Sequence, residues 1–556
     1  DTLQAVYLDY EQACYKGSLV DFGELLLRSH ELWLKNPQLL KHYQQRFQHI
    51  LVDEFQDTNT IQYAWLRVLA GKSAHVFAVG DDDQSIYGWR GARIENIQRF
   101  SQDFAPVKMV RLEQNYRSTG TILNAANHVI ANNESRLGKE LWTDKGEGEP
   151  ILLYAAFNEQ DEARFIVERI KDWVERGGQR SEIAILYRSN AQSRVLEEAL
   201  LREGVAYRVY GGQRFYERAE IRNALCYLRL VQNRDDDTAV ERIINTPTRG
   251  IGEKTVEVLR QYVREHGGSL WAAARSLLEH KTFKARAANA LQAFIELIEN
   301  FEAVSGAVPF DELVDHIIVK SGLIDFHKKE AGEKGRQRVE NLEELVSACK
   351  SFEPEEDERS VLRQFLDTAA LEAGEGQAKE YEDSVQMMTL HSAKGLEFPV
   401  VFLAGMEENL FPHRMSMDDL DGLEEERRLC YVGLTRAMQQ LYLCYAEVRR
   451  MHGNENYNMP SRFIREIPSE LLREVRINAQ VERPVSFGSR VSNLFQNNAT
   501  DTEQGLSLGQ RVSHAHFGEG HIINVEGSGN RTRVQVNFDY EGVKWLMLSH
   551  ANLQGL

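Results

Sequence analysis

The sequence has 556 residues, 42% of them hydrophobic, which is enough for several domains with apolar cores. Its formal net charge of −18 excludes a protein coated with basic charge, but not a local basic groove, because local patches decide nucleic-acid binding. No apolar run is long enough to cross a membrane, and the five cysteines show no C-x-x-C pairing, which indicates scattered thiols in a reducing cytosol.

Two carboxylates follow the first predicted strand directly. Residues 1–47 read as mostly helical, and the apolar run Ile50–Val52 after them is typical of a buried parallel strand. Asp53 and Glu54 come next, at the end of the strand where open α/β sheets bind ligands. There Asp53 can hold a hydrated Mg²⁺ and Glu54 can orient a water as general base. The alternative is that both are only solvated, because Asp-Glu after a strand is common.

The next predicted strand, His75–Val79, repeats this arrangement. The polar run Gly80–Gln84 lies at its tip, where Gln84 is a candidate to sense a terminal phosphate or to position water. Tyr87, Trp89 and Arg90 follow closely, and aromatics with arginine suit stacking on single-stranded bases, worth about 1–3 kcal/mol per base. The alternative is that Tyr87 and Trp89 pack into a domain interface.

A nucleotide-driven motor needs a phosphate loop of the form G-x-x-x-x-G-K-[ST], and this sequence contains none. Gly71-Lys72-Ser73 has the right ending, but Leu66 stands where the first glycine belongs. This stretch also follows a helical pattern, so Gly71 is predicted to be a helix C-cap.

Further along, strand and helix patterns alternate and then give way to helices. The predicted strands are 151–154, 183–187, 385–388 and 400–403, and the predicted helices between or after them include 161–174, 195–201 and 423–432. Residues 212–383 read as helix after helix. This organisation predicts a second α/β unit that is interrupted by a helical insertion.

The sharpest feature of the helical region is a Gly-Ile-Gly turn that opens a helix. Backbone N–H groups at Gly250 and Gly252 are candidates to bind a phosphate of duplex DNA, with Arg249 and Lys254 in support. The alternative is an ordinary turn between two helices.

Residues 478–505 are polar and are predicted to form a flexible linker. The tail after them has short strand patterns with glycine turns, typical of a small SH3-like or Tudor-like barrel. Its three histidines, His514, His516 and His521, lack cysteines or carboxylates at ligand spacing, which disfavours a metal site.

Several segments together resemble the motifs of superfamily 1 DNA helicases of the UvrD/Rep type, in that family's order. They are Asp53–Asp57, Gly80–Ala92, Gln114–Ser118, Thr389–Phe398, and Glu425–Leu429 continuing through Thr435–Ala437. The resemblance implies an α/β fold of two RecA-like P-loop NTPase motor domains, the first incomplete, with helical insertions and a small C-terminal SH3/Tudor-like barrel. The predicted divisions are a remnant of the first insertion (1–47), part of the first motor domain (48–113), the second motor domain (114–210 and 384–477), its insertion (211–383), the linker (478–505) and the barrel (506–556).

The resemblance also assigns roles to residues that have little meaning alone. It implies that Arg117 and Arg436 meet the γ-phosphate as catalytic arginines, that Tyr116 stacks on adenine, and that Glu397 takes the ribose. It makes His391 and Lys394 candidates for DNA contact or for coupling, beside Tyr87 and Trp89 on the single-strand path. The implied cofactors are ATP and Mg²⁺.

By the same resemblance, the expected function is an ATP-dependent 3′→5′ DNA helicase or translocase that acts in nucleotide excision repair, mismatch repair and replication. Its expected partners are single-stranded and forked DNA, repair proteins and, through the barrel, RNA polymerase, in the bacterial cytoplasm at the nucleoid. Because the family's phosphate loop lies upstream of the matched region, the chain is expected to be a fragment that is inactive alone. The alternative is a non-catalytic module that binds DNA and docks partners; a nuclease–helicase fusion is disfavoured, since the tail has no carboxylate–lysine cluster.

Overall fold

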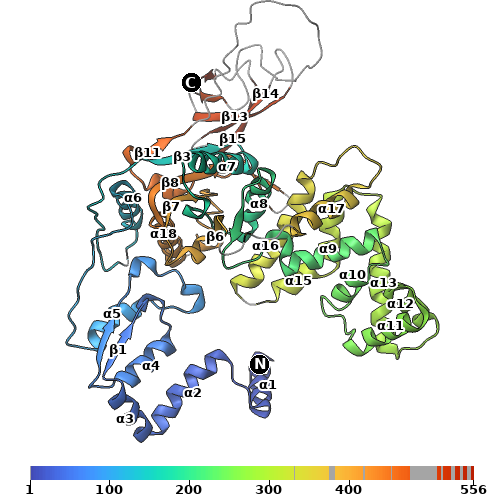
Figure 1. Cartoon of the computed structure of the whole chain (residues 1–556), viewed down its shortest axis with the longest axis horizontal. Coiled ribbons are helices and arrows are strands. Elements are labelled where there is room, and N and C mark those ends of the chain that lie inside the picture. Colours follow the sequence, from blue (N-terminus) through green and yellow to red (C-terminus); the bar gives the residue numbers. More distant parts are fainter. Residues whose placement is uncertain are drawn as a thin grey trace, which may run out of the picture.

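The computed structural model arranges the chain as two parallel-sheet units, a helical unit and a small β-structure (Figure 1). It describes residues 2–134, 136–330, 332–374, 378, 382–417, 420–451, 454–475, 510–514, 517–526, 533–538, 542–547 and 553–555. The predicted linker, 478–505, lies outside these residues, and so does His516.

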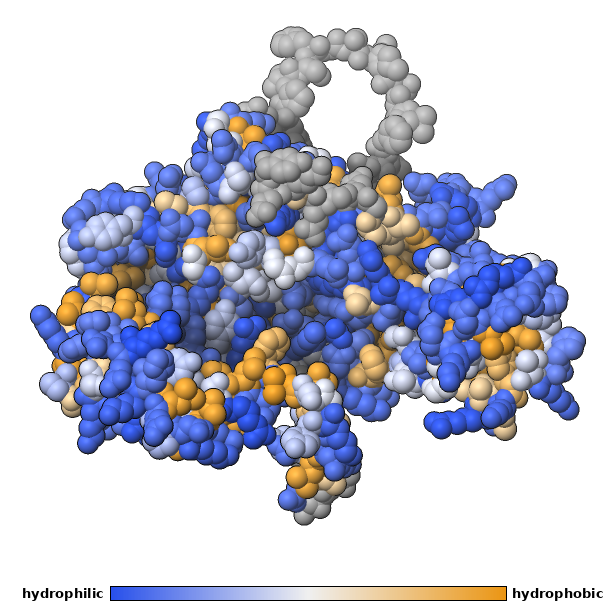
Figure 2. Space-filling model, turned by 60° about the horizontal axis from the view of Figure 1, so that its bottom comes forward, coloured by the Kyte–Doolittle hydropathy of each residue, from blue (hydrophilic) through white to orange (hydrophobic). Residues whose placement is uncertain are grey.

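The N-terminal part combines helices with a two-stranded parallel sheet, β1 with β2. Its elements are α1 (Thr2–Gly17), α2 (Phe22–Lys35), α3 (Pro37–Arg46), β1 (His49–Val52), α4 (Thr60–Ala70), β2 (His75–Ala78) and α5 (Glu95–Asp103). Phe55, Tyr63 and Leu66 form a small core against one face of the sheet. The other face is open, since Leu51 is 78% and Phe77 67% exposed. Figure 2 shows hydrophobic residues at the surface of this part of the molecule.

Helix α4 explains why the glycine–lysine–serine stretch is not a phosphate loop. Asn59 and Gln62 form a reciprocal capping box at its start, and the backbone N–H of Gly71 donates to the Arg67 carbonyl at its end. Gly71 has φ of 56°, a conformation that favours glycine. The predicted C-cap is therefore confirmed.

The second α/β unit is a seven-stranded parallel sheet in the order β11-β3-β8-β7-β4-β6-β5. The strands are β3 (Ile151–Ala156), β4 (Ile183–Tyr187), β5 (Tyr207–Val209), β6 (Val385–Thr389), β7 (Phe398–Leu403), β8 (Ala437–Ala446) and β11 (Leu472–Glu474). Alternate residues along the strands feed two separate cores. One core includes α6 (Gly120–Ile130) and α18 (Leu420–Leu434), and the other includes α7 (Glu159–Glu175) and α8 (Ser193–Arg202). Because residues 210–384 separate the neighbouring strands β5 and β6, the helical region is an insertion in this sheet.

The insertion has one continuous apolar core of its own, centred on residues such as Tyr227, Phe294 and Leu345. It consists of α9 (Ala219–Gln232), α10 (Asp237–Ile243), α11 (Glu253–His266), α12 (Leu270–Glu279), α13 (Ala285–Ser305), α14 (Phe310–Lys320), α15 (Leu323–Lys328), α16 (Glu333–Ser351) and α17 (Val361–Gly374). The prediction of a helical insertion is confirmed for its described residues.

The C-terminal strands form an antiparallel sheet in the order β15-β14-β13-β12-β16. They are β12 (Arg511–His514), β13 (Gly518–Glu526), β14 (Arg533–Phe538), β15 (Gly542–Met547) and β16 (Gln554–Gly555). Val534, Val536 and Phe538 alternate inward from β14, as expected of a strand with one buried face. In the described part of the chain, no helix is long and apolar enough to cross a bilayer.

Candidate functional site

Asp53 and Glu54 lie where β1 ends, and the backbone turns sharply between them and the next helix. Glu54 has φ of 49°, in the left-handed region that a non-glycine residue rarely adopts. This turn brings Gln56 back so that its side-chain amide donates to the Glu54 carboxylate. The Asp53 carboxylate is exposed and accepts the backbone N–H of Glu54 at 2.9 Å. Strain at a strand tip of this kind is typical of functional sites.

The tips of β1 and β2 are joined by hydrogen bonds of buried Gln56. The N–H of Asp81 donates to Gln56 Oε1 at 2.9 Å, while Gln56 Nε2 donates to Glu54. Asp81 in turn accepts the side-chain amide of Gln84 at 2.7 Å. The two predicted catalytic groups Glu54 and Gln84 are therefore linked through Gln56 and Asp81, two residues that sequence reasoning gave no role.

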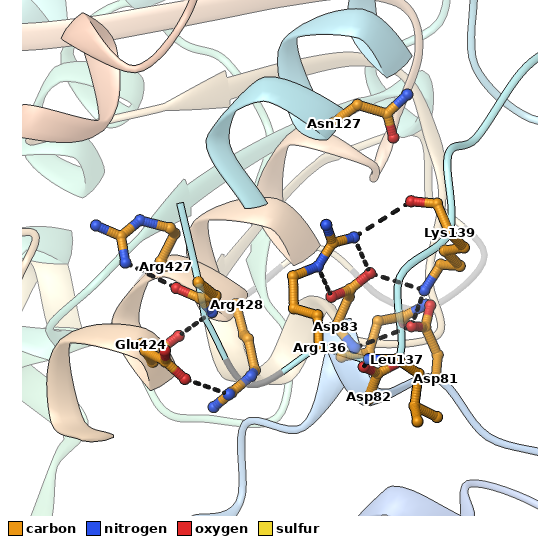
Figure 3. Close-up of polar contacts among 12 residues, drawn as sticks. Asp81, Asp82, Asp83, Asn127, Arg136, Leu137, Lys139, Glu424, Arg427 and Arg428 are labelled. Atoms are coloured by element: carbon orange, nitrogen blue, oxygen red, sulfur yellow. Dashed lines mark hydrogen bonds and ion pairs between the residues drawn. The ribbon is translucent and has the colours of Figure 1, made fainter. Parts of the chain in front are cut away.

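The acidic triplet Asp81–Asp83 has the ligand spacing of a metal site, since its carboxylate oxygens lie within 4.8 Å of one another. Two of its three charges are already paired, however, Asp83 with Arg136 and Lys139 and Asp81 with Lys139 (Figure 3). Burial raises the pKa of Asp83, but hydrogen bonds from Arg136 and the nearby cations outweigh burial and leave this pKa below its usual value. Lys139 behaves in the converse way, because the charges of Asp81 and Asp83 overcome its burial and raise its pKa.

Lys394 connects the second sheet to these strand tips. It lies just after the short 3₁₀ helix η7 (Leu390–Ala393), which follows β6, and its ammonium donates to Asp57 Oδ2 at 2.6 Å and to the Gln84 carbonyl at 2.9 Å. The same ammonium lies 3.3 Å from Glu54 Oε2. Burial raises the pKa of Asp57, and Lys394 opposes this shift. Lys394 was predicted to contact DNA or to couple the units; its ammonium contacts the first unit, and which of the two roles it has stays a prediction.

The predicted DNA-stacking residues gather beside this contact. The Arg90 guanidinium lies 4.5 Å from the Trp89 ring centroid and 5.0 Å from that of Tyr87. His391 meets the Trp89 ring edge-on at 6.4 Å, and the Tyr87 hydroxyl donates to the His391 carbonyl at 3.2 Å. Tyr87 is half-buried at the contact between the two units, whereas Trp89 is half-exposed, and base stacking by these rings stays a prediction.

Arg117, Glu397 and Tyr116 lie together at the edge of the second unit. Arg117 Nε donates to Glu397 at 2.6 Å, and this hydrogen bond is the main reason why the pKa of Glu397 is lowered. The Tyr116 ring is 75% exposed, and its hydroxyl donates to Gln114 Oε1 at 2.9 Å. An exposed ring beside an arginine suits the predicted adenine contact, which stays a prediction.

Arg436 is buried rather than open to a ligand. Its guanidinium donates to the carbonyls of Val432 at 3.0 Å and Leu396 at 2.9 Å, and it is 1% exposed. Burial, with the charge of Arg117 adding to it, lowers the pKa of Arg436 to about 10, so the group stays protonated at neutral pH. In this conformation Arg436 is held by its own domain.

The predicted duplex-binding turn divides into an anchoring and an open part. Arg249 donates to the carbonyls of Ile243 and Pro247, both at 3.1 Å, and to that of Ser321 at 2.9 Å, so its guanidinium holds the turn. Gly250 has φ of 82°, Gly252 caps α11, and a side chain added at either would meet open space. The structure therefore leaves the glycine N–H groups and Lys254, rather than Arg249, as the exposed part of this prediction.

Three family models match the chain in sequence. The UvrD/REP helicase N-terminal domain matches residues 1–105, the UvrD-like helicase C-terminal domain matches 110–448, and the PcrA/UvrD tudor domain matches 508–554. The chain belongs to the UvrD-like helicase family.

Named relatives of this UvrD-like chain are similar over nearly its whole length. It is 58% identical to DNA helicase II of Escherichia coli strain K12, aligning over 100% of the chain and 77% of that protein. It is likewise 58% identical to DNA helicase II of Salmonella typhimurium, and 41% identical to the ATP-dependent DNA helicase PcrA of Bacillus subtilis, covering 76% of each. The predicted family and fold class, including the Tudor-like barrel, are confirmed.

The residues of this UvrD-like site fit a hydrated Mg²⁺ at Asp53. Within the described residues, the Asp53 carboxylate has no cationic partner, and it is exposed beside the general-base candidate. A carboxylate oxygen that is not neutralised by a cation is the hard ligand that Mg²⁺ prefers. The acidic triplet nearby offers this less well, because Arg136 and Lys139 bind Asp83 and Asp81, and Asp82 accepts the N–H of Leu137.

Sequence reasoning missed Arg136, Lys139 and Gln56. Gln56 carried a signal, since it stands inside the Asp53–Asp57 motif. Arg136 and Lys139 stand in a polar loop and pair with acids more than 50 positions earlier, as the 53-residue separation of Arg136 and Asp83 shows, so no local pattern indicates their partners.

Proposed function

We propose that this chain is the motor part of an ATP-dependent DNA helicase that moves 3′→5′ along single-stranded DNA. The observation that carries the proposal is one continuous contact region between the two α/β units. There Lys394 contacts the carboxylates of Asp57 and Glu54 after β1. Beside it, the Tyr87 hydroxyl donates to the His391 carbonyl within the stacking cluster, the group formed by Tyr87, Trp89, Arg90 and His391. A shift of the carboxylates at the tip of β1, where the nucleotide is proposed to bind, is therefore expected to move the residues proposed to contact DNA.

Each site residue has a role in this proposal. Asp53 holds the water shell of Mg²⁺, which, when bound, screens the phosphate charge. Glu54 accepts the proton of the attacking water, and Gln84 orients that water against the γ-phosphate. Glu54 lies 3.3 Å from the Lys394 ammonium, so a cation of the second unit stands beside the proposed base.

The two arginines act from the second unit. Arg117 leaves Glu397 to meet developing phosphate charge, which frees the Glu397 carboxylate for the ribose hydroxyls. Arg436 exchanges its bonds to the Val432 and Leu396 carbonyls for phosphate oxygens. Because both exchanges require the two units to close on the nucleotide, hydrolysis and domain closure are linked.

The proposed hydrolysis requires a phosphate loop, which these residues do not contain. We attribute hydrolysis to a polypeptide that contains both these residues and a phosphate loop, which we call the complete motor. We propose that this chain is a part of such a polypeptide. The open face of the β1–β2 sheet supports this, since exposed Leu51 and Phe77 are typical of strands that further elements cover.

Direction of movement and cellular role rest on family membership. On that basis we propose action in nucleotide excision repair, mismatch repair and replication, in the bacterial cytoplasm at the nucleoid. The barrel is proposed to dock protein partners, including repair proteins and RNA polymerase, because its family model is a tudor domain.

A second candidate is a non-catalytic module that binds DNA and docks partners. The missing phosphate loop favours it, since the stacking cluster and the barrel do not depend on ATP. Strand displacement by the complete motor separates the two functions. A helicase of the proposed direction unwinds duplexes with a 3′ single-stranded tail in the presence of ATP, whereas a binding module binds these substrates without unwinding them. Preferential unwinding of 5′-tailed duplexes would contradict the proposed direction alone.

A further inference from the structure

A loop of the second α/β unit contacts the first unit beside the strand tips that carry the catalytic candidates. Residues 136–142, which we call the strap, follow α6 and lead toward β3. Their first half lies against the acidic triplet Asp81–Asp83, as Figure 3 shows. Their last residue lies against the Gln114–Ser118 motif, because the N–H of Asn115 donates to the Trp142 carbonyl at 2.7 Å. The strap therefore touches motifs of both units.

Every acid of the triplet is held by the strap. Arg136 donates from Nε and Nη2 to the two oxygens of Asp83, both at 2.7 Å. Asp82 accepts the N–H of Leu137 at 2.7 Å, and Lys139 lies 3.0 Å from Asp83 and also binds Asp81. The Asp83 side chain is 2% exposed and those of Arg136 and Lys139 about 15%, so these charges are shielded from water. A bidentate, shielded pair of this kind fixes geometry closely.

Asp81 links the strap to the catalytic candidates Gln84 and Glu54 through hydrogen bonds. One of its oxygens accepts Lys139 and the N–H of Asp83, and the other accepts the Gln84 side chain at 2.7 Å. Its own N–H donates to Gln56, whose amide donates to Glu54. A chain of hydrogen bonds thus runs from Lys139 in the second unit to Gln84 and Glu54 in the first.

We propose that Lys139 and Arg136 are positioning residues for Gln84, so that the strap sets the orientation of the phosphate-sensing side chain from the opposite motor unit. This rests on the proposed function, in which Gln84 acts on the γ-phosphate or its water. Loss of Lys139 removes the cation that lies between Asp81 and Asp83, so these two carboxylates repel each other. The Asp81 side chain is then no longer held in the position from which it binds the Gln84 amide. Neither strap residue touches the nucleotide in this account, and both act through Asp81 or Asp83.

The test is a double-mutant cycle on ATP turnover by the complete motor, with saturating single-stranded DNA. Gln84→Ala is expected to lower kcat by about 100-fold, as for loss of one transition-state group. Lys139→Met is expected to lower kcat by about 10- to 100-fold with the KM for ATP nearly unchanged, since misplacement of the sensor affects the chemical step. In the Gln84→Ala background, Lys139→Met is expected to have almost no further effect, because its target is already absent.

Two variants distinguish positioning from general damage. Lys139→Arg keeps the charge and is expected to restore most of kcat. Lys171→Met removes an exposed lysine that pairs with Glu203 on the same unit, and it is expected to leave kcat unchanged. Single-stranded DNA affinity without ATP is expected to be unaltered in all of these variants.

Three results would overturn the proposal. They are an unchanged kcat for Lys139→Met, an equal loss from Lys139→Met in both backgrounds, and a loss of DNA affinity that matches the loss of kcat. If Gln84→Ala itself retains wild-type turnover, the role of Gln84 fails, and the strap proposal fails with it. If the wild-type complete motor has no DNA-stimulated turnover, it is the proposed function that fails.

Discussion

Lys394 and Asp57 stand 337 positions apart in the chain, yet the lysine ammonium donates to the aspartate carboxylate at 2.6 Å. The lysine follows the β6 strand of the second sheet, and the aspartate belongs to the turn after β1. The Lys394 side chain is 6% exposed, so water screens the pair little. The pair therefore joins the two α/β units at the strand tip that carries the general-base candidate.

Replacing Lys394 by Met should reduce the coupling between DNA and hydrolysis. The variant leaves Asp57 half-buried without its cation and removes the positive charge 3.3 Å from Glu54. We expect the stimulation of ATP turnover by single-stranded DNA to fall about tenfold or more in the complete motor, with a smaller effect on basal turnover. Turnover with and without oligonucleotide measures both values. An unchanged stimulation ratio would contradict the coupling role.

Trp89 should contribute directly to single-strand affinity. Its ring is half-exposed and is held by Arg90 on one side and His391 at its edge. Trp89→Ala should weaken binding of a single-stranded oligonucleotide by about 1–3 kcal/mol, the value of one base stacked on an aromatic ring. Fluorescence anisotropy with labelled oligonucleotide measures this. Phe157→Ala, which removes a comparably exposed ring on the second unit, is the control and should bind normally.

His391 should make the folded chain sensitive to acid. Burial, followed by the positive charge of Arg188, lowers its pKa to about 3, while Arg90 adds to this shift and Glu426 opposes it. Because the folded pKa lies below the unfolded value of 6.5, the unfolded chain takes up a proton first as the pH falls. Above pH 6.5 the group does not alter stability, and between 6.5 and 3 it favours unfolding.

The comparison that isolates this effect is wild type against His391→Gln in urea denaturation at pH 7 and pH 4. Wild type should lose about 1–3 kcal/mol more stability than the variant between these values. Parallel losses in the two proteins would show that His391 titrates normally in the folded chain.

The Gly250–Gly252 turn should discriminate duplex from single-stranded DNA. Valine at both positions covers the open N–H groups, and at Gly250 it also meets a φ of 82°. We expect the double variant to lose about tenfold in duplex affinity and little in single-strand affinity. Binding of hairpin and single-stranded oligonucleotides at one fixed salt concentration measures the ratio. Equal losses on both substrates would indicate misfolding of the insertion instead.

The sequence predicted the strands β3, β4, β6 and β7 of the second sheet because their apolar runs are local, but it did not predict β5, β8 and β11. The β4 strand was predicted at residues 183–187 and lies there, and the tips carrying Asp53 and Gln84 follow from the same apolar runs. The helical insertion was predictable too, since it interrupts the pattern between β5 and β6.

What local pattern cannot show is how a charged side chain is used. Arg436 and Arg249 were both assigned to phosphate, but the structure shows their guanidinium groups bound to carbonyls of their own domain. The partners of Arg136 lie in a different unit, so its role depends on how the two units pack. Sequence reasoning found the motif residues through resemblance, and missed those that hold them in place.

The central claim is that Glu54 and the strand tips drive a DNA-stimulated hydrolysis, and ATP turnover by the complete motor tests it most directly. Single-stranded DNA should raise turnover by about 10-fold or more, and Glu54→Gln should abolish turnover while ATP still binds. Glu54 carries this prediction because it is exposed at the end of β1 and is linked through Gln56 and Asp81 to Gln84. Turnover that is indifferent to DNA, or that survives Glu54→Gln, would contradict the account.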